Sequence, residues 1–231
     1  NRLKKNNGKI FLCACGSDSF FWRNIEHVLK YGKEQLNETK KFDMNNKSPS
    51  RLSKRDFEFN SYIADNVDGI IPVNYEYHIA YKSHPNLRNF IPQPIDIKEN
   101  NNQNAFEINN CKIFHGLSRY GMKGTRFIES AFKKLENSKF RNHDFVIKGQ
   151  LPLEQYLKEI ESSTIIVDQC FSRSYGMNAL YAMSLGKIVL SGADKSFIKF
   201  MNLKKIPVIN IIPQSKQIFE SISNLLENPN K

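Results

Sequence analysis

Between residues 111 and 231, short apolar runs alternate with segments of helical periodicity, and this alternation limits the possible fold more than any other feature. The apolar runs predict strands at 111–116, 145–149, 164–169, 187–192 and 206–211. Helical patterns lie between and after them, at 123–137, 152–160, 175–185, 196–203 and 217–227. Strands that are apolar on both faces are typical of a parallel sheet covered by helices on both sides. The alternation therefore predicts an α/β fold, with a doubly wound, Rossmann-like domain.

The first part of the chain alternates in the same way but offers fewer strands. Apolar runs predict strands at 9–15 and 69–73, and helical patterns occur at 20–35, 54–66 and 75–81. The polar stretch 37–53 shows no periodicity and predicts a loop.

These patterns divide the chain into three parts. A partial N-terminal Rossmann-like domain is expected over 1–97, and a second Rossmann-like domain over 111–231. The polar segment 98–110 between them predicts a linker.

Charge and cysteine content leave several partners open. The net charge of +11 is compatible with nucleic acid, anionic lipid or a phosphate-rich ligand. The cations are scattered among Asn and Glu, which favours a solvated surface, and no nucleic-acid recognition motif occurs. The cysteines lack zinc-site spacing and indicate reduced thiols in a cytosolic protein. No apolar run approaches the roughly 20 residues of a membrane span.

Two loops follow strands at the edge where doubly wound sheets bind ligands. The first, HGLSRYGMKG at 115–124, places Arg119 and Lys123 just after a strand. A cation at a helix start is unfavourable for the helix, and a diphosphate between these two side chains would resolve that misfit. The alternative is a pair of exposed surface cations.

The second loop leads into the helical stretch SYGMNALYAM at 174–183. Ser174 can cap a helix that begins near Tyr175, and Gly176 removes a side chain from the first turn. The N–H groups of that turn would then be open to an anion. The alternative is that Gly176 only relieves packing against a strand.

Together, KIFHGLSRYGMKGTRFIESAFKKLE and TIIVDQCFSRSYGMNALYAMSLGKIVLSG resemble the donor-binding half of GT-B glycosyltransferases, specifically the retaining, bacterial polysaccharide-type group. IPQPID at 91–96 is similar to the end of that family's first domain. The resemblance implies a GT-B fold, a nucleotide-diphosphate sugar as donor substrate, no cofactor and no metal. It also implies a diphosphate site formed by Arg119, Lys123, Ser174, Tyr175 and Gly176.

The chain departs from the family at two positions that usually hold glutamate, where it has Arg173 and Tyr181. The second glutamate normally holds the nucleotide ribose, so we expect that contact to be weaker or moved to a group such as Asp194. The alternative is that Tyr181 packs in the core.

Further candidates lie near the same strand ends. His115, Gln169, Asn178 and Tyr181 are candidates for contacts with the donor sugar or nucleoside. Asp18 is an acceptor-side candidate, although a helix-capping role is the interpretation we favour.

The resemblance also implies a βα unit before residue 1 and a closing helix after residue 231. The expected activity is transfer of a sugar to a bacterial surface glycan or a lipid-linked acceptor. The expected location is the cytoplasm, with peripheral contact at the inner face of the membrane as one option. Two alternatives are a catalytically inactive relative that acts as a binding or assembly partner and, less favoured, a basic nucleic-acid-binding protein.

Overall fold

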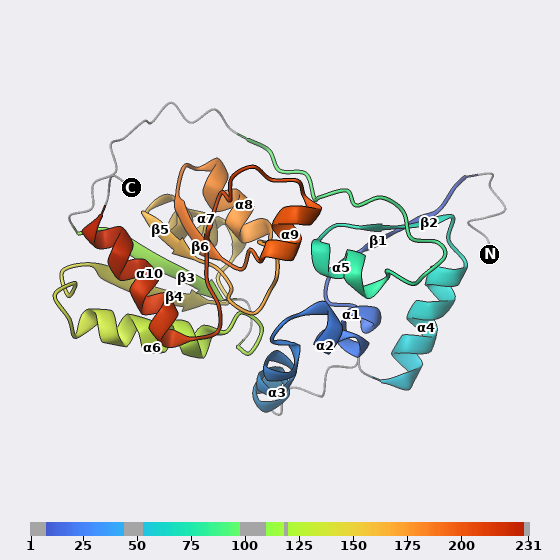
Figure 1. Cartoon of the computed structure of the whole chain (residues 1–231), viewed down its shortest axis with the longest axis horizontal. Coiled ribbons are helices and arrows are strands. Elements are labelled where there is room, and N and C mark those ends of the chain that lie inside the picture. The colour runs from blue at the N-terminus through green and yellow to red at the C-terminus, as the bar shows by residue number, and fades with distance from the viewer. Residues whose placement is uncertain (1–7, 44–52, 98–109, 118–119, 229–231) are drawn as a thin grey trace. The chain divides into compact units, whose positions relative to one another are not determined.

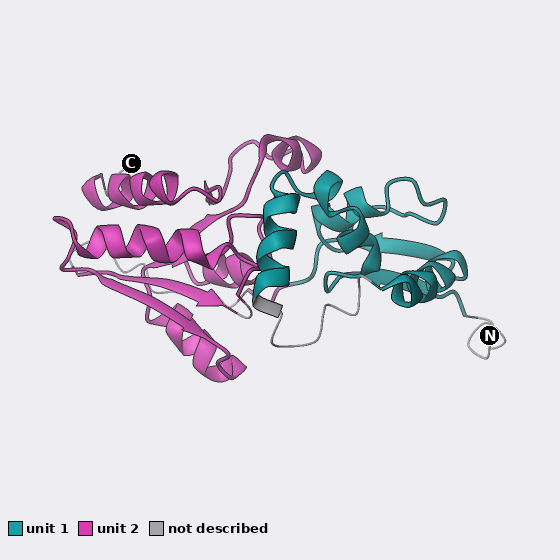
Figure 2. Ribbon diagram, turned by 90° about the horizontal axis from the view of Figure 1, so that it is seen from below, with its two compact units in different colours: residues 1–94 teal, residues 95–231 magenta. Residues whose placement is uncertain are grey.

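The computed structural model describes residues 8–43, 53–97, 110–117 and 120–228 (Figure 1). The chain divides into two compact units, Asn1–Pro94 and Ile95–Lys231 (Figure 2). Apart from Asn110, the predicted linker 98–110 lies outside the described residues.

Unit 2 contains a five-stranded parallel sheet. Its strands, in chain order, are β3 (Lys112–Leu117), β4 (Asp144–Gly149), β5 (Ile165–Val167), β6 (Ile188–Ser191) and β7 (Ile209–Asn210). Their order across the sheet is β4-β3-β5-β6-β7, and every neighbouring pair is parallel. The predicted α/β class with a parallel sheet is therefore confirmed.

Helices cover both faces of this sheet. They are α6 (Thr125–Glu136), α7 (Leu153–Glu161), α8 (Met177–Ser184), α9 (Lys195–Phe200) and α10 (Ser215–Glu227). Helices α6 and α10 pack against each other, and their buried side chains form one core with Ile113, Ile165 and Val167. Phe114, the next residue along β3, points to the other face, because its ring packs against Tyr156 of α7. Successive strand residues thus fill two hydrophobic layers.

Unit 1 contains two parallel strands, β1 (Phe11–Ala14) and β2 (Gly69–Pro72). Its helices are α1 (Ser19–Arg23), α2 (Ile25–Val28), α3 (Gly32–Asp43), α4 (Lys54–Asp65) and α5 (Tyr75–Ala80). The strands and the helices α4 and α5 lie where the sequence predicts them.

The single helix expected over 20–35 is wrong, because the structure breaks it into α1, α2 and the start of α3. Asn24 separates the first two, and its side-chain amide donates to the Phe20 carbonyl. Leu29 is extended and ends α2. The chain then turns so tightly that a β-carbon on Gly32 would lie 2.0 Å from the Ile25 carbonyl oxygen. Apolar spacing alone does not reveal such a turn.

The loop expected from residue 37 onward is also wrong in part, because α3 continues to Asp43. This helix buries the polar residues Gln35, Glu38 and Thr39. Its buried face therefore lacks the apolar repeat by which an amphipathic helix is detected.

Gly124, the N-cap of α6, and Gly186, just after the C-cap of α8, provide a matched test of packing. Both have positive φ, 76° and 70°. A β-carbon on Gly186 would meet nothing within 4 Å, whereas one on Gly124 would lie 2.2 Å from the buried Cys170 Sγ. We expect Gly186→Ala to lower the free energy of unfolding by about 1 kcal/mol, the cost of left-handed backbone for an L-residue. Gly124→Ala should lose clearly more, because the clash adds to that cost. Chemical denaturation of both variants measures the difference, and equal losses would contradict the packing described here.

Candidate functional site

The strand order of unit 2 identifies the edge of the sheet at which a ligand site is expected. From β3 the chain passes to β4 on one side, and from the neighbouring β5 it passes to β6 on the other side. Open α/β sheets bind ligands at the carboxyl ends of strands where the connections diverge in this way. The loops that leave β3 and β5 are the two that the sequence singles out. We call Lys123, Asp168, Gln169 and Gly176, which lie on these loops, the switch-point site.

Gly176 is the N-cap of α8, and neither its backbone nor its surroundings require glycine. Its φ of −100° and ψ of −171° are extended, a conformation open to any residue. A β-carbon here would meet only the side-chain nitrogen of Gln169, at 3.5 Å, which is ordinary contact. Relief of packing therefore does not explain this glycine. The first turn of α8 contains no acidic residue, and its N-cap makes no side-chain hydrogen bond to the N–H groups there.

The loop before α8 differs from expectation in its capping. The helix begins at Met177, not near Tyr175, and Ser174 is buried ahead of the N-cap. The backbone carbonyl of Ser174 accepts a hydrogen bond of 3.2 Å from the Gln169 amide, while the Tyr175 ring packs edge-on against Phe197. These contacts hold the chain that leads to Gly176.

Two side chains of α8 lie partly exposed beyond this start. Asn178 is half-buried in the first turn, and Tyr181 is 36% exposed. The Tyr181 hydroxyl forms no hydrogen bond with any residue in the described ranges. The alternative that Tyr181 packs in the core is therefore wrong.

Lys123 is not an exposed surface cation, because only 9% of its side chain is accessible. Its ammonium donates hydrogen bonds of 2.8 Å to the Gly116 carbonyl and 2.8 Å to Asp168 Oδ1. Asp168 thus provides the counter-charge that a cation at the start of α6 needs. Arg119, the other predicted phosphate ligand, lies outside the described residues.

His115 does not face a cleft, contrary to expectation, since its side chain is fully buried. Its Nδ1–H donates to the Val167 carbonyl at 2.7 Å, and its Nε2 accepts from the Thr125 hydroxyl at 3.0 Å. Burial, and secondarily the charge of Lys123, lowers the pKa of His115 to about 4. The ring is therefore neutral at pH 7 and joins β3, β5 and α6 as a structural bridge.

At the first of the two usual glutamate positions, Arg173 pairs with Asp194. The guanidinium lies 3.1 Å from Asp194 Oδ2 and also donates to Ser196. Asp194 Oδ1 caps α9 by accepting from the Phe197 N–H. Since both carboxylate oxygens are engaged, Asp194 is not placed as an open ribose ligand.

Asp18, in unit 1, is the N-cap of α1. Its Oδ1 accepts from the Phe21 N–H at 2.9 Å, and its Oδ2 accepts from the Tyr81 hydroxyl at 2.8 Å. The capping role that the sequence favours for Asp18 is thus confirmed. Both of its carboxylate oxygens accept hydrogen bonds from residues of unit 1.

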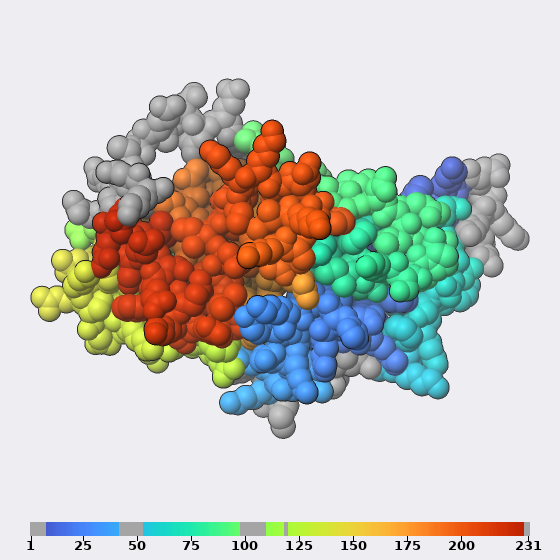
Figure 3. Space-filling model, in the orientation of Figure 1, coloured from blue at the N-terminus to red at the C-terminus, as the bar shows by residue number. Residues whose placement is uncertain are grey.

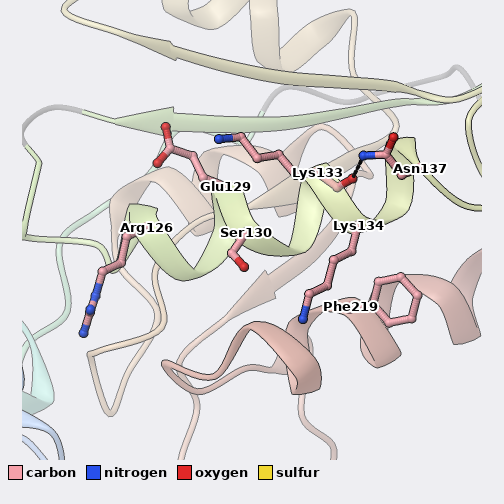
Figure 4. Close-up of a pocket in the computed structure, with 7 residues that line it drawn as sticks. All are labelled: Arg126, Glu129, Ser130, Lys133, Lys134, Asn137 and Phe219. Atoms are coloured by element: carbon pink, nitrogen blue, oxygen red, sulfur yellow. Dashed lines mark hydrogen bonds between the residues drawn. The ribbon is translucent and has the colours of Figure 1, made fainter.

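A separate groove of about 660 Å³ lies along α6 and α10, which adjoin on one face of unit 2 (Figure 3). Figure 4 shows Lys134 reaching from α6 toward α10, where Phe219 lies. The groove is lined by Arg126, Glu129, Ser130, Lys133, Lys134, Asn137 and Phe219. The α6 positions recur at helical spacing, which could have revealed one polar helix face but not the groove. Both signs of charge occur in it, so it does not identify a ligand.

Two further properties concern metals and membranes. Within the described ranges, no three His, Cys, Asp or Glu side chains gather as a metal site would need. None of the helices in those ranges combines the length and the hydropathy of a membrane span.

No protein-family model matches the sequence, and no curated protein sequence matches it. Solved structures do match. TarM is 15% identical with a TM-score of 0.53, and the match covers 79% of this chain and 41% of TarM. HepE from Anabaena, in complex with UDP and glucose, is 14% identical with a TM-score of 0.53, covering 79% of this chain and 60% of HepE. A mutant of S. aureus TarM, in complex with fondaparinux, alpha-GlcNAc-glycerol and UDP, is 14% identical with a TM-score of 0.51. This match covers 78% of this chain and 42% of the TarM mutant.

The chain therefore spans between about two fifths and three fifths of the length of these neighbours. At such low identity the likeness concerns the fold alone, and it confirms the predicted GT-B class of α/β fold with parallel sheets.

The buried His115 predicts a pH-dependent stability. Its pKa lies at about 4 in the folded protein and near 6.5 in the unfolded chain, so the unfolded state binds more protons between these values. The stabilisation is fully present above pH 6.5 and is lost as the pH falls toward 4, by an amount on the order of 3 kcal/mol.

His115→Asn removes this titration, so the free energy of unfolding of this variant should vary less between pH 4 and 6.5. His27→Asn, at an exposed position, serves as the control for replacing a histidine outside the core. Identical pH profiles for the His115 variant and the parent would contradict this account.

Proposed function

We propose that this chain is a glycosyltransferase that uses a nucleotide-diphosphate sugar and binds the donor diphosphate at the switch-point site. The observation that carries the proposal is Gly176, a glycine at a helix start that neither backbone conformation nor packing requires. A bound anion explains it, because a side chain there would keep a phosphate away from the N–H groups of α8. The UDP complexes of neighbours with the same fold support a nucleotide donor.

The proposed chemistry follows from where charge develops. The bond between the sugar and the diphosphate breaks while a bond forms from the sugar to an acceptor hydroxyl oxygen, and the hydroxyl proton leaves to the departing diphosphate. In the transition state the sugar gains oxocarbenium character and the leaving diphosphate gains negative charge. The N–H groups at the start of α8 and the Lys123 ammonium would stabilise that charge. Arg119 is expected to assist, and Ser174 and Tyr175 to shape the loop. With these cations as counter-charges, no metal is needed, and retention of configuration follows the family resemblance.

The nucleoside and the sugar would lie beyond the diphosphate. Tyr181 and Asn178 are the partly exposed side chains of α8 proposed to contact the ribose. Gln169 borders the open side of Gly176 and is proposed to reach the donor. His115 drops out of this set, because both of its ring nitrogens are engaged in the core.

The proposed acceptor is a bacterial surface glycan or a lipid-linked glycan. The glycan ligands in the TarM mutant complex support an acceptor of this class. We place the reaction in the cytoplasm, with contact at the inner face of the membrane when the acceptor is lipid-linked. Nucleic acid is not proposed as a partner.

A second candidate is a catalytically inactive relative that binds a nucleotide sugar or an assembly partner. It is favoured by Arg173 and Tyr181 at the usual glutamate positions and by the pairing of Arg173 with Asp194. Hydrolysis of nucleotide sugars separates the two candidates, because an active transferase releases nucleoside diphosphate slowly in the absence of acceptor.

Substitution of Gly176 tests the diphosphate site. We expect Gly176→Val to abolish nucleoside diphosphate binding and to leave unit 2 folded, because an added β-carbon makes only ordinary contact, 3.5 Å from the Gln169 side-chain nitrogen. Titration calorimetry with UDP, GDP, ADP, CDP and dTDP measures binding, and thermal melting measures the fold. Gly8→Val is the control, since an added β-carbon there meets nothing within 4 Å and Gly8 lies in unit 1. Parental affinity in the Gly176 variant would place the phosphates elsewhere.

Tyr181 makes a separate prediction about the ribose. A phenol can form one hydrogen bond to a ribose hydroxyl, whereas a carboxylate can hold both hydroxyls. We expect a preference for ribonucleoside over 2′-deoxyribonucleoside diphosphate that disappears in Tyr181→Phe, a loss of about 1 kcal/mol for one hydrogen bond. The same calorimetric titrations compare the two nucleotides. If the preference survives removal of the hydroxyl, the ribose is recognised by another group.

A further inference from the structure

We propose that Asp168 is a positioning residue of the donor site, which holds the Lys123 ammonium so that one of its N–H donors remains available for a phosphate. This inference rests on the proposed function, and it adds a residue whose role the resemblance does not imply.

The hydrogen-bond geometry of Lys123 is the first step. An ammonium group has three N–H donors. Gly116 and Asp168 take two of them, each at 2.8 Å. Within the described ranges the third donor has no partner. Because Lys123 lies in the loop that leaves the carboxyl end of β3, directly before the α6 N-cap Gly124, we infer that this donor faces the edge of the sheet where the ligand site is expected.

The burial of the pair is the second step. The side chains of Lys123 and Asp168 are only 9% and 3% exposed. Burying two charges costs desolvation free energy, and apolar residues of similar volume often stabilise a fold equally well or better. Three apolar residues of β5, Ile165–Val167, come directly before Asp168, so an apolar residue would suit that position. An ion pair here is therefore better explained by a need for a fixed cation than by a need for stability.

The contacts around the pair show how the cation is fixed. The Asp168 N–H donates to the Leu190 carbonyl at 2.8 Å, and Ser191 donates to Asp168 Oδ2 at 3.4 Å. The backbone carbonyl of Lys123 accepts from the Cys170 N–H at 3.0 Å. The loop after β3 is thus tied to the loop after β5 twice, once through the ion pair and once through the backbone. A long lysine side chain loses up to about 2 kcal/mol of rotamer entropy when it is ordered, and here that loss occurs during folding instead of during ligand binding.

The test compares nucleoside diphosphates with the corresponding monophosphates. Asp168→Asn keeps an oxygen acceptor but removes the charge that orients Lys123. We expect diphosphate affinity to fall by about tenfold or more, the range of a charge-assisted hydrogen bond, with monophosphate affinity little changed. Glu159→Gln is the matched control, because Glu159 pairs with Lys112 at 2.8 Å elsewhere in unit 2. It should change thermal stability alone.

A double variant, Lys123→Met with Asp168→Leu, separates positioning from stability. It replaces the ion pair with apolar residues of similar size and should fold while still lacking the diphosphate preference. If it recovers parental affinity, the pair is only a structural link and the inference is overturned.

Parental affinity in Asp168→Asn would overturn the inference as well, while the proposed function would stand. If Asp168→Asn does not fold, parental affinity in the double variant still overturns the inference. Failure of the parent protein to bind any of the five nucleoside diphosphates named above would overturn the proposed function and this inference together.

Discussion

The buried polar contacts at the carboxyl ends of β3 and β5 are the constraint on which the switch-point site depends. Lys123 pairs with Asp168 across the two loops, and His115 joins Val167 to Thr125. The two contact sets connect both strands with the start of α6, and each polar group in them has a partner, as burial requires. The loops that leave β3 and β5 in opposite directions are thereby held together at their bases. A site assembled from these loops inherits that rigidity.

Much of the fold of unit 2 could be predicted, because the residues that form its two apolar layers occur in the sequence as apolar runs. Runs such as Ile165–Val167 are apolar at every position, as strands buried on both faces must be. Unit 1 is less predictable for physical reasons. The face that α3 buries is partly polar, with Glu38 and Thr39 among its buried residues, and the turn at Gly32 depends on contact with Ile25. Neither feature leaves a periodic signal.

The sequence predicts where a candidate site would lie, but it does not predict the partners of the charged residues there. The strand pattern placed Lys123 and Gly176 near each other, since both follow parallel strands. The partners of the charged residues were not visible, because Asp168 lies 45 residues from Lys123 and Asp194 lies 21 residues from Arg173 in the chain. His115 shows the same limit. Its position at a strand end fits a ligand contact, and only the distances to Val167 and Thr125 reveal a structural role.

These pairings also explain why α8 can lack a carboxylate. In the loops that follow the five strands of unit 2, the sequence has only two carboxylates, Asp168 and Asp194. The first is neutralised by Lys123 and the second by Arg173 while it caps α9. Within the described residues, these two loop carboxylates are therefore both paired with cations. A glutamate on α8 would add an unbalanced negative charge beside a diphosphate, whereas Tyr181 offers a neutral hydroxyl. On the proposed function, the arrangement lacks the two-point ribose contact of a carboxylate and keeps an edge suited to a highly charged anion.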